Sequence, residues 1–341
     1  MKQRILKLKK SPYEGARTSV KYSRLFSEQT FSELSKLSFT EILKYLEEHG
    51  YKKSIDISYL HYQGFYLIEQ ILNDHMSEIY EKCIATSCKE NKELLESYYQ
   101  KYKIHNLLAL IRCKKASEED ILPFLIGDKR NKEKCLKAQE MGDSKEAILY
   151  LTKKMGLDSQ ECLIQYEKGL YEFENFLYNQ YYNTLAKCKV QYNKHDENKY
   201  LKIITHQIDL LNARTFLRLK KEEVSEESKD SFSFLIPSGD IPFSLFKDLE
   251  NKTFEEAFQI VKKVVKEECG EEIADLEDMD AALMRAKIHA QKLLHSVQFG
   301  SPFYVMKYLF DAEREVSRLR ILLKAKYLKV EDEKIAELIR E

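Results

Sequence analysis

The sequence contains few of the residues that interrupt helices. Only 10 glycines and 5 prolines occur among its 341 residues, and these are the residues that most often end or kink a helix. The alternating apolar and polar pattern of a half-buried strand is also scarce, whereas Leu, Lys and Glu dominate long segments with helical periodicity. The composition therefore predicts an all-α protein.

Long apolar runs are missing as well. No stretch reaches the 18 or so uncharged apolar residues that a membrane-spanning helix needs, and the lysine-rich amino terminus lacks the apolar core and cleavage site of a secretory signal. The seven cysteines include no pair at the close spacing typical of metal or redox sites. We therefore expect no direct membrane span and a reducing, cytoplasmic environment.

The motifs of common catalytic and cofactor sites are absent too. There is no Walker or Rossmann glycine pattern, no nucleophile elbow and no helical His-Glu-x-x-His. The nearest histidines, His289 and His295, are six residues apart, which would turn their rings about 120° apart on a helix. Cys83 and Cys88 lie in a lysine-rich stretch that could lower a thiol pKa, but an isolated cysteine on a helix surface is usually unreactive. We predict no catalytic residue, no cofactor and no metal.

The chain has no net charge, with 56 basic and 56 acidic residues, so its overall field gives no general attraction to nucleic acid. Local runs remain. Residues 1–24 hold eight Lys or Arg against Glu14 alone, and Glu271 to Asp280 contains six acids and no base. Two interpretations stay open for both runs: solvated surface, or docking patches for partners of opposite charge.

One helical unit is written three times, at intervals of about 105 residues. Each copy begins with a short polar residue and a carboxylate three positions later, the pattern of a capping box at a helix start. The pairs are Ser38 with Glu41, Asp143 with Glu146, and Thr253 with Glu256. Each copy then has an acidic residue just ahead of an apolar pair, at Glu69, Glu174 and Asp280.

Each copy also carries a polar pair six residues apart near its end. The pairs are Asn106 and Arg112, Asn212 and Arg218, and Arg314 and Arg320. In the first copy, helical spacing places Asn106 nearly opposite the apolar stripe and Arg112 on its rim. Rim arginines reach neighbouring helices with a forked head. We expect ties between helices or lobes ahead of direct partner contact, and in neither role do these residues react.

Prolines mark the joints between the copies. Pro123 follows the first polar pair, and Pro237 and Pro242 follow the second. Both joints begin with a serine and acidic residues, at Ser117 and Ser225. We therefore predict three helical lobes, at residues 1–122, 123–236 and 237–341. Three equal lobes can close around an axis and leave a central recess, although periodicity alone does not distinguish a closed funnel from an open stack.

Four segments occur in a fixed order and are spread over nearly the whole chain. They are Tyr13 to Arg17 with Arg24 and Leu25; Tyr102 to Leu107 with Arg112 and Lys114; Ile208 to Thr215 with Arg218; and Glu313 to Lys326. Together they resemble the C subunit of archaeal and bacterial A/V-type ATPases, which is similar to the d subunit of eukaryotic vacuolar ATPases. Two positions depart from that pattern: Lys103 stands where the family usually has Asp, and Arg318 replaces a frequent Asn.

The resemblance implies a funnel of three pseudo-threefold-related helical lobes on the cytoplasmic face of a membrane-embedded proteolipid ring. Such a rotor subunit would receive the central shaft and pass torque between the ATP-handling head and the ring, coupling ATP hydrolysis or synthesis to proton or sodium transport. The implied partners are shaft subunits of the D and F type and the proteolipid ring, without nucleic acid. A helical interaction scaffold, or a helical enzyme with an unrecognised acid or cysteine, are the alternative interpretations.

Overall fold

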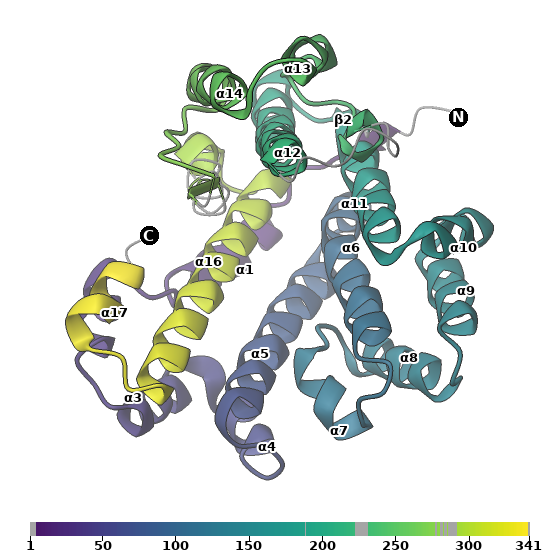
Figure 1. Cartoon of the computed structure of the whole chain (residues 1–341). Coiled ribbons are helices and arrows are strands. Elements are labelled where there is room, and N and C mark those ends of the chain that lie inside the picture. Colours follow the sequence, from purple (N-terminus) through teal and green to yellow (C-terminus); the bar gives the residue numbers. More distant parts are fainter. Residues whose placement is uncertain are drawn as a thin grey trace. The chain divides into compact units, whose positions relative to one another are not determined.

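The computed structural model describes residues 5–187, 189–221, 231–276, 278, 279, 282, 285 and 292–339. Helices make up most of this part of the chain, which confirms the all-α prediction. The chain divides into two compact units, each built from two separate stretches of sequence (Figure 1). Unit 1 comprises Met1–Lys9 and Lys168–Gln298, and unit 2 comprises Lys10–Glu167 and Phe299–Glu341.

Unit 2 is organised around one long helix near the end of the chain, α16 (Pro302–Tyr327), which packs against α1, α3, α5 and α17. In chain order its other helices are α1 (Pro12–Tyr22), α2 (Glu28–Leu34), α3 (Phe39–Leu46), the π-helix η1 (Glu47–Tyr51), α4 (Lys52–Ser58), α5 (Gly64–Thr86), α6 (Lys89–Arg112), α7 (Glu118–Ile121), the 3-10 helix η2 (Leu122–Phe124), α8 (Lys129–Glu140), α9 (Ser144–Met155), α10 (Ser159–Lys168) and α17 (Asp332–Leu338). Thus the last 40 or so residues complete a fold begun by the first helices.

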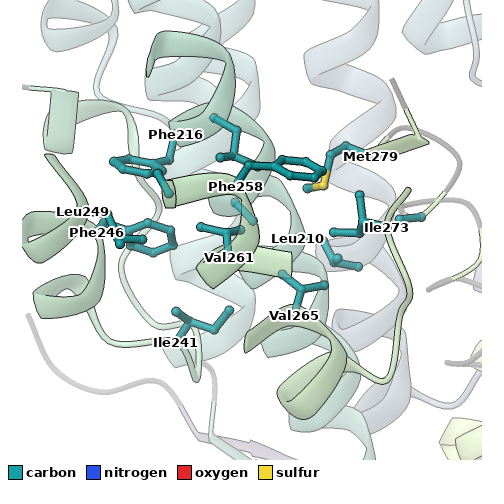
Figure 2. Packing of buried hydrophobic residues seen from close by; sticks show 14 of the residues in the cluster. Leu210, Phe216, Ile241, Phe246, Leu249, Phe258, Val261, Val265, Ile273 and Met279 are labelled. Carbon is teal, nitrogen blue, oxygen red and sulfur yellow. The ribbon is translucent and has the colours of Figure 1, made fainter. Parts of the chain in front are cut away.

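Unit 1 is built around α12, which packs against α11 and α14. Its elements are β1 (Ile5–Lys7), α11 (Leu170–Lys187), β2 (Lys189–Gln191), α12 (Lys194–Lys221), η3 (Ser231–Phe234), α13 (Phe243–Glu250), α14 (Phe254–Cys269) and η4 (Leu294–Ser296). Figure 2 shows its core, in which Leu210 and Phe216 from α12 meet Phe246 from α13 and Val261 and Val265 from α14. These side chains are nearly inaccessible to water, so their burial is the main stabilising contribution in this unit.

A short parallel strand pair is the main departure from the expectation of an all-helical chain. Ile5 of β1 is in register with Lys189 of β2, and Leu6 with Val190. Leu6 and Val190 are both buried, so the pair contributes to the core as well as to the hydrogen bonding of unit 1. Strands of three residues leave almost no alternating pattern to detect, and the pairing joins segments from opposite halves of the sequence.

Helix starts follow the predicted polar signals closely. Reciprocal capping boxes form at α3, at α7 and at α14, where the side chains of Ser38, Ser117 and Thr253 each accept from the backbone N–H of the third helical residue. At α9 the predicted box is wrong. Asp143 accepts from the Lys145 backbone N–H at 2.9 Å, one residue earlier than a box requires, and Glu146 does not bond back.

The two compact units do not follow the three predicted lobes. The predicted joint at residue 122 lies within η2 of unit 2, and the joint at residue 236 lies just after η3 of unit 1. Pro123 is the second residue of the 3-10 helix η2 and Pro242 is the N-cap of α13, so both prolines lie at helix starts. Ser225 and Asp280 lie outside the described residues. The division into three equivalent lobes around an axis stays a prediction.

Candidate functional site: polar clamps on the long helices and an exposed apolar surface

Asn106 lies in the last third of α6, and its side chain forms hydrogen bonds with the backbone of Ile126, 20 residues further along the chain. Its Oδ1 accepts from the Ile126 N–H at 2.9 Å, and its Nδ2 donates to the Ile126 carbonyl at 2.8 Å. The side chain is 2% exposed. The expectation that Asn106 points away from the buried side of α6 is therefore wrong, because the chain after η2 returns to cover that face.

Asn212 on α12 makes the same pair of bonds in unit 1. Its Oδ1 accepts from the Ile236 N–H at 2.7 Å, and its Nδ2 donates to the Ile236 carbonyl at 2.9 Å. Both clamped isoleucines end a Phe-Leu-Ile sequence, at residues 124–126 and 234–236. That repeated tripeptide, together with the repeated Asn, is a sequence signal from which the clamp could have been predicted, and the pattern of caps and arginines alone misses it.

Arg318 on α16 occupies the corresponding place in the third copy, since it lies 106 residues after Asn212, as Asn212 lies after Asn106. Its Nε donates to the carbonyl of Ile339, which again follows a leucine. A guanidinium has no acceptor for a backbone N–H. Its remaining donors instead bind both carboxylate oxygens of Glu28, at 2.8 and 2.7 Å, and its plane lies over the Phe31 ring at 3.8 Å.

The predicted arginines occupy three kinds of position. Arg320 ties α16 to α5, donating to Glu69 at 3.0 Å and to Asn73 at 2.9 Å. Arg314 is half-buried and donates to Glu28 at 3.2 Å, so it shares a partner with Arg318. Arg112 and Arg218 are exposed, at the end of α6 and near the end of α12 respectively.

The acidic positions predicted by the repeat also differ from one another. Glu69 on α5 is buried and forms ion pairs with Arg320 and with Lys324, whose Nζ lies 2.6 Å from the Glu69 Oε1. Asn73, one turn further along α5, donates to the carbonyl of Pro123 at 2.8 Å. Asn73 thus connects Arg320 on α16 with Pro123, at the predicted joint between the first two lobes. Glu174 lies on α11, and Asp280 is outside the described residues.

One turn before the clamp residue, the second and third copies each bury a carboxylate. Asp209 accepts from the backbone N–H groups of Asp240 and Ile241, both at 3.0 Å. Burial raises the Asp209 pKa to about 6, although the two N–H bonds act in the opposite direction. Glu315 is the equivalent on α16, and burial raises its pKa to about 7. In the first copy the equivalent residue is Lys103, and burial lowers the pKa of its amino group.

Apolar side chains of unit 2 are exposed where α4 meets α5 and where α16 ends. We call these residues the apolar surface: Ile57, Tyr59, Leu60, Phe65, Tyr66, Tyr327 and Leu328. Leu60, in the turn before α5, is 79% exposed. The rings of Phe65 and Tyr327 lie 5.1 Å apart and join the two groups. Exposed groups of large apolar side chains commonly mark contact sites.

One family model matches the sequence over almost its full length. The model of the ATP synthase (C/AC39) subunit family matches residues 15–338. The chain belongs to this family. The resemblance inferred from the sequence is therefore confirmed.

Relatives of this member of the C/AC39 family are named as the C subunit of A-type ATP synthase. The protein of Methanococcoides burtonii is 27% identical over 336 residues, which cover 94% of this chain and 91% of the relative. That of Methanosarcina acetivorans is 26% identical over 332 residues, covering 94% and 90%. That of Archaeoglobus fulgidus is 29% identical over 232 residues, covering 67% and 65%.

In this C/AC39 family member neither Cys83 nor Cys88 is an activated thiol. Burial raises the pKa of Cys83, although the nearby Lys21 acts in the opposite direction, and burial raises the pKa of Cys88 to about 11. The lysines therefore do not produce a lowered pKa at either of these two thiols. Within the described residues no cluster of three His, Cys, Asp or Glu side chains could hold a metal ion. His289 lies outside those residues. No described helix is long and apolar enough to cross a bilayer.

The acidic run is partly paired within unit 1, whereas the one acid of the basic run is bonded to neutral groups. Glu14, the one acid of the basic run, is buried and accepts from the Asn91 side chain at 3.0 Å and from the Cys88 backbone N–H. In the acidic run, Arg285 pairs with Asp278 at 3.0 Å and with Glu271 at 3.4 Å. Their role in docking a partner stays a prediction.

Proposed function

We propose that this chain is a non-catalytic subunit of the central rotor of an A/V-type ATP synthase or ATPase. In this role it links the central shaft to the membrane proteolipid ring and passes torque between them. The match to the C/AC39 subunit family over residues 15–338 is the observation that carries the proposal. Relatives that cover most of the chain and are named as the C subunit of A-type ATP synthase support it.

Torque transmission requires elements that hold their shape under load. The clamps at Asn106, Asn212 and Arg318 support such a role, because each fixes a loop to a long helix by buried hydrogen bonds. Buried polar groups that are fully paired define one arrangement of the backbone. The protein would couple ATP hydrolysis or synthesis to proton or sodium transport while forming no bond itself. It would lie in the cytoplasm, peripheral on the membrane through the complex.

The apolar surface is our candidate for one of the two partner contacts. Its side chains are large and its members come from separate elements of unit 2, with Leu60 the most exposed. Aromatic anchors of this kind are enriched in protein interfaces. The partners that we propose are shaft subunits of the D and F type and the proteolipid ring, without nucleic acid.

Capture experiments with native components test the proposal. The purified full-length chain should bind the shaft subunits and the proteolipid ring prepared from its own organism. If it captures neither, the rotor function is wrong. ATP hydrolysis by the isolated chain, retained through further purification, would favour an enzyme instead.

A further inference from the structure

One short sequence pattern begins a long helix in each of the first two copies of the repeat. Residues 64–66 are Gly-Phe-Tyr at the start of α5, and residues 169–171, 105 positions later, are Gly-Leu-Tyr at the start of α11. The side chains that follow the two glycines are exposed, with Tyr66 at 41% and Tyr171 at 50%. We call Phe65 with Tyr66 the first pad, which is part of the apolar surface, and Leu170 with Tyr171 the second pad.

Each pad tyrosine packs against a phenylalanine of a clamped loop. The Tyr66 ring lies 5.7 Å from the Phe124 ring, and the Tyr171 ring lies 5.0 Å from the Phe234 ring. These phenylalanines begin the two Phe-Leu-Ile sequences whose isoleucines are held by the asparagine clamps. The exposed tyrosines thus rest on loops that are themselves fixed, so little conformational freedom is lost when a partner covers them.

The third copy lacks such a pad. Its equivalent residue is Leu276, which precedes Asp280 by four positions as Leu170 precedes Glu174. A glutamate follows Leu276 in place of the tyrosine, and the leucine side chain packs against the core of unit 1. The repeat can therefore be built with this position covered, which indicates that exposure in the first two copies serves contact with a partner.

Carboxylates lie around the first pad. Burial raises the pKa of Tyr62, in the turn before α5, and the charges of four nearby acids raise it further: Glu119, Asp74, Glu118 and Asp120. Lys324 approaches the Phe65 ring at 6.0 Å, but its Nζ is ion-paired with Glu69 at 2.6 Å. The edge of the first pad is thus acidic, and a partner of complementary charge is basic.

We propose that the two pads bind the cytoplasmic loops of the proteolipid ring, each pad taking one loop that combines apolar and basic side chains. The proposal rests on the rotor function and adds which of the partners these residues contact. The tyrosines supply the apolar anchors, and the acids beside the first pad pair with basic side chains of the loop.

Two features select the ring over the shaft and over lipid. A closed ring is built from identical subunits, so it offers the same loop to both equivalent pads, whereas a shaft subunit presents a given segment once. Cytoplasmic loops of membrane proteins carry an excess of Lys and Arg, which fits the acidic edge of the first pad. The anionic surface of a bilayer would instead be repelled by these carboxylates.

Capture of the detergent-solubilised ring by the full-length chain tests the pads. Tyr66→Asp and Tyr171→Asp should each weaken ring capture by at least about tenfold, and the double variant should weaken it further, because each change removes an aromatic anchor and adds a charge that must be desolvated. Capture of the shaft should stay at the wild-type level. Tyr66→Phe and Tyr171→Phe keep the aromatic rings and should bind normally, as should Leu201→Asp, a control at an exposed position on α12.

The outcomes separate failure of the pads from failure of the rotor function. If the wild type captures the ring and the double aspartate variant captures it equally well, the pads are wrong while the rotor function stands. Lost capture of the shaft with intact capture of the ring would assign the pads to the shaft and overturn the proposal. A wild-type chain that does not capture the ring would contradict both.

Hydroxyl-radical labelling of the unaltered chain keeps the test independent of how well the variants fold. Saturating ring should reduce oxidation of both Tyr66 and Tyr171 by at least about threefold, because covered rings lose contact with solvent. Addition of the shaft should leave both unchanged, and Leu201 serves as the internal reference. If a bound ring protects neither tyrosine, or one alone, the proposal is wrong.

Salt and lipid controls test the chemistry of the partner. Ring capture should weaken as the salt concentration rises, and combining Glu118→Gln with Glu119→Gln should reduce that dependence. Vesicles of phosphatidylcholine and phosphatidylglycerol that lack the ring should not bind the chain. An unchanged salt dependence in the glutamine variant would overturn the basic loop, and vesicle binding that the double aspartate variant loses would assign the pads to lipid instead.

Discussion

A primary amide is well suited to replace a missing partner of a peptide group, because it offers one acceptor and donors side by side. Asn106 and Asn212 use both, and each thereby satisfies the N–H and the carbonyl of one buried isoleucine. Arg318, at the same position in the third copy, can bond only to a carbonyl, because a guanidinium has no acceptor for an N–H. Its other contacts are with the carboxylate of Glu28 and the ring of Phe31. The same position in the repeat is thus filled by two different chemical solutions.

Asn212→Ala tests the amide clamp in unit 1. It leaves the N–H and the carbonyl of Ile236 buried without their partner, so the free energy of unfolding should fall by about 2–4 kcal/mol. Urea unfolding followed by circular dichroism measures this change. Lys263→Ala, an exposed change on α14 whose ion pair with Glu267 spans 3.9 Å, should stay within about 0.5 kcal/mol. Equal stability of the two variants would contradict the clamp.

Gly15→Ala tests a close approach between α1 and the start of α16. An added Cβ would lie 2.7 Å from the backbone N of Gly300 and 2.9 Å from its Cα, so the two segments would have to separate. Alanine is the better helix former, yet the overlap should dominate and cost about 1–3 kcal/mol. Thermal unfolding would show it. Ser19→Ala, on the exposed side of α1, provides the control, and a stabilised Gly15→Ala variant would disprove the close packing.

At the scale of elements, what the sequence predicts depends on how local each signal is. Helix starts at Ser38, Ser117 and Thr253 were predictable because a cap involves residues three positions apart. The buried orientation of Asn106 was not, since it depends on a loop 20 residues later that covers a second side of α6. The β1–β2 pair was not predictable either, because each strand is three residues long and is specified by its distant partner.

Glu256 and Glu146 are exposed glutamates at the third position of their helices, but only Glu256 forms a capping box. Removing each one distinguishes the effect of the box from that of an N-terminal charge alone. Glu256→Ala on α14 removes the carboxylate that accepts from the Thr253 N–H at 3.1 Å, and should cost about 0.5–1 kcal/mol. Glu146→Ala on α9 removes a carboxylate at the same helical position that makes no such bond. Because both interact with the helix dipole alike, only Glu256 should show the additional loss. Chemical unfolding would measure both, and equal losses would argue against the box.

At the scale of the whole molecule, composition and helical periodicity were enough to predict the fold class, and the order of motifs along the chain was enough to predict the family. The division into two units was not predictable, because both units are discontinuous in sequence. Unit 2 combines α1 to α10 with α16 and α17, and unit 1 takes β1 from the beginning of the chain. The repeat of about 105 residues is a property of the sequence. The compact units, in contrast, depend on which segments, distant in sequence, pack together.

The apolar surface belongs to this scale, since it concerns how the whole protein meets its partners. Leu60→Asp should weaken capture of the proteolipid ring or the shaft by at least about tenfold without lowering the melting temperature, because the side chain is exposed. Quantitative capture with the native components measures it. Ile164→Asp, at an exposed position on α10, should bind normally. Full binding of both partners by Leu60→Asp would remove this surface from the interface.

The dependence of unit 2 on α16 has a consequence for biosynthesis. Helices α1, α3 and α5 leave the ribosome long before Pro302–Tyr327, the helix against which they pack, has been translated. Domains generally fold as complete units during synthesis, and apolar surface exposed in the interval is prone to aggregation. The faces of these helices that pack on α16 must therefore stay uncovered until residues 302–327 have been translated.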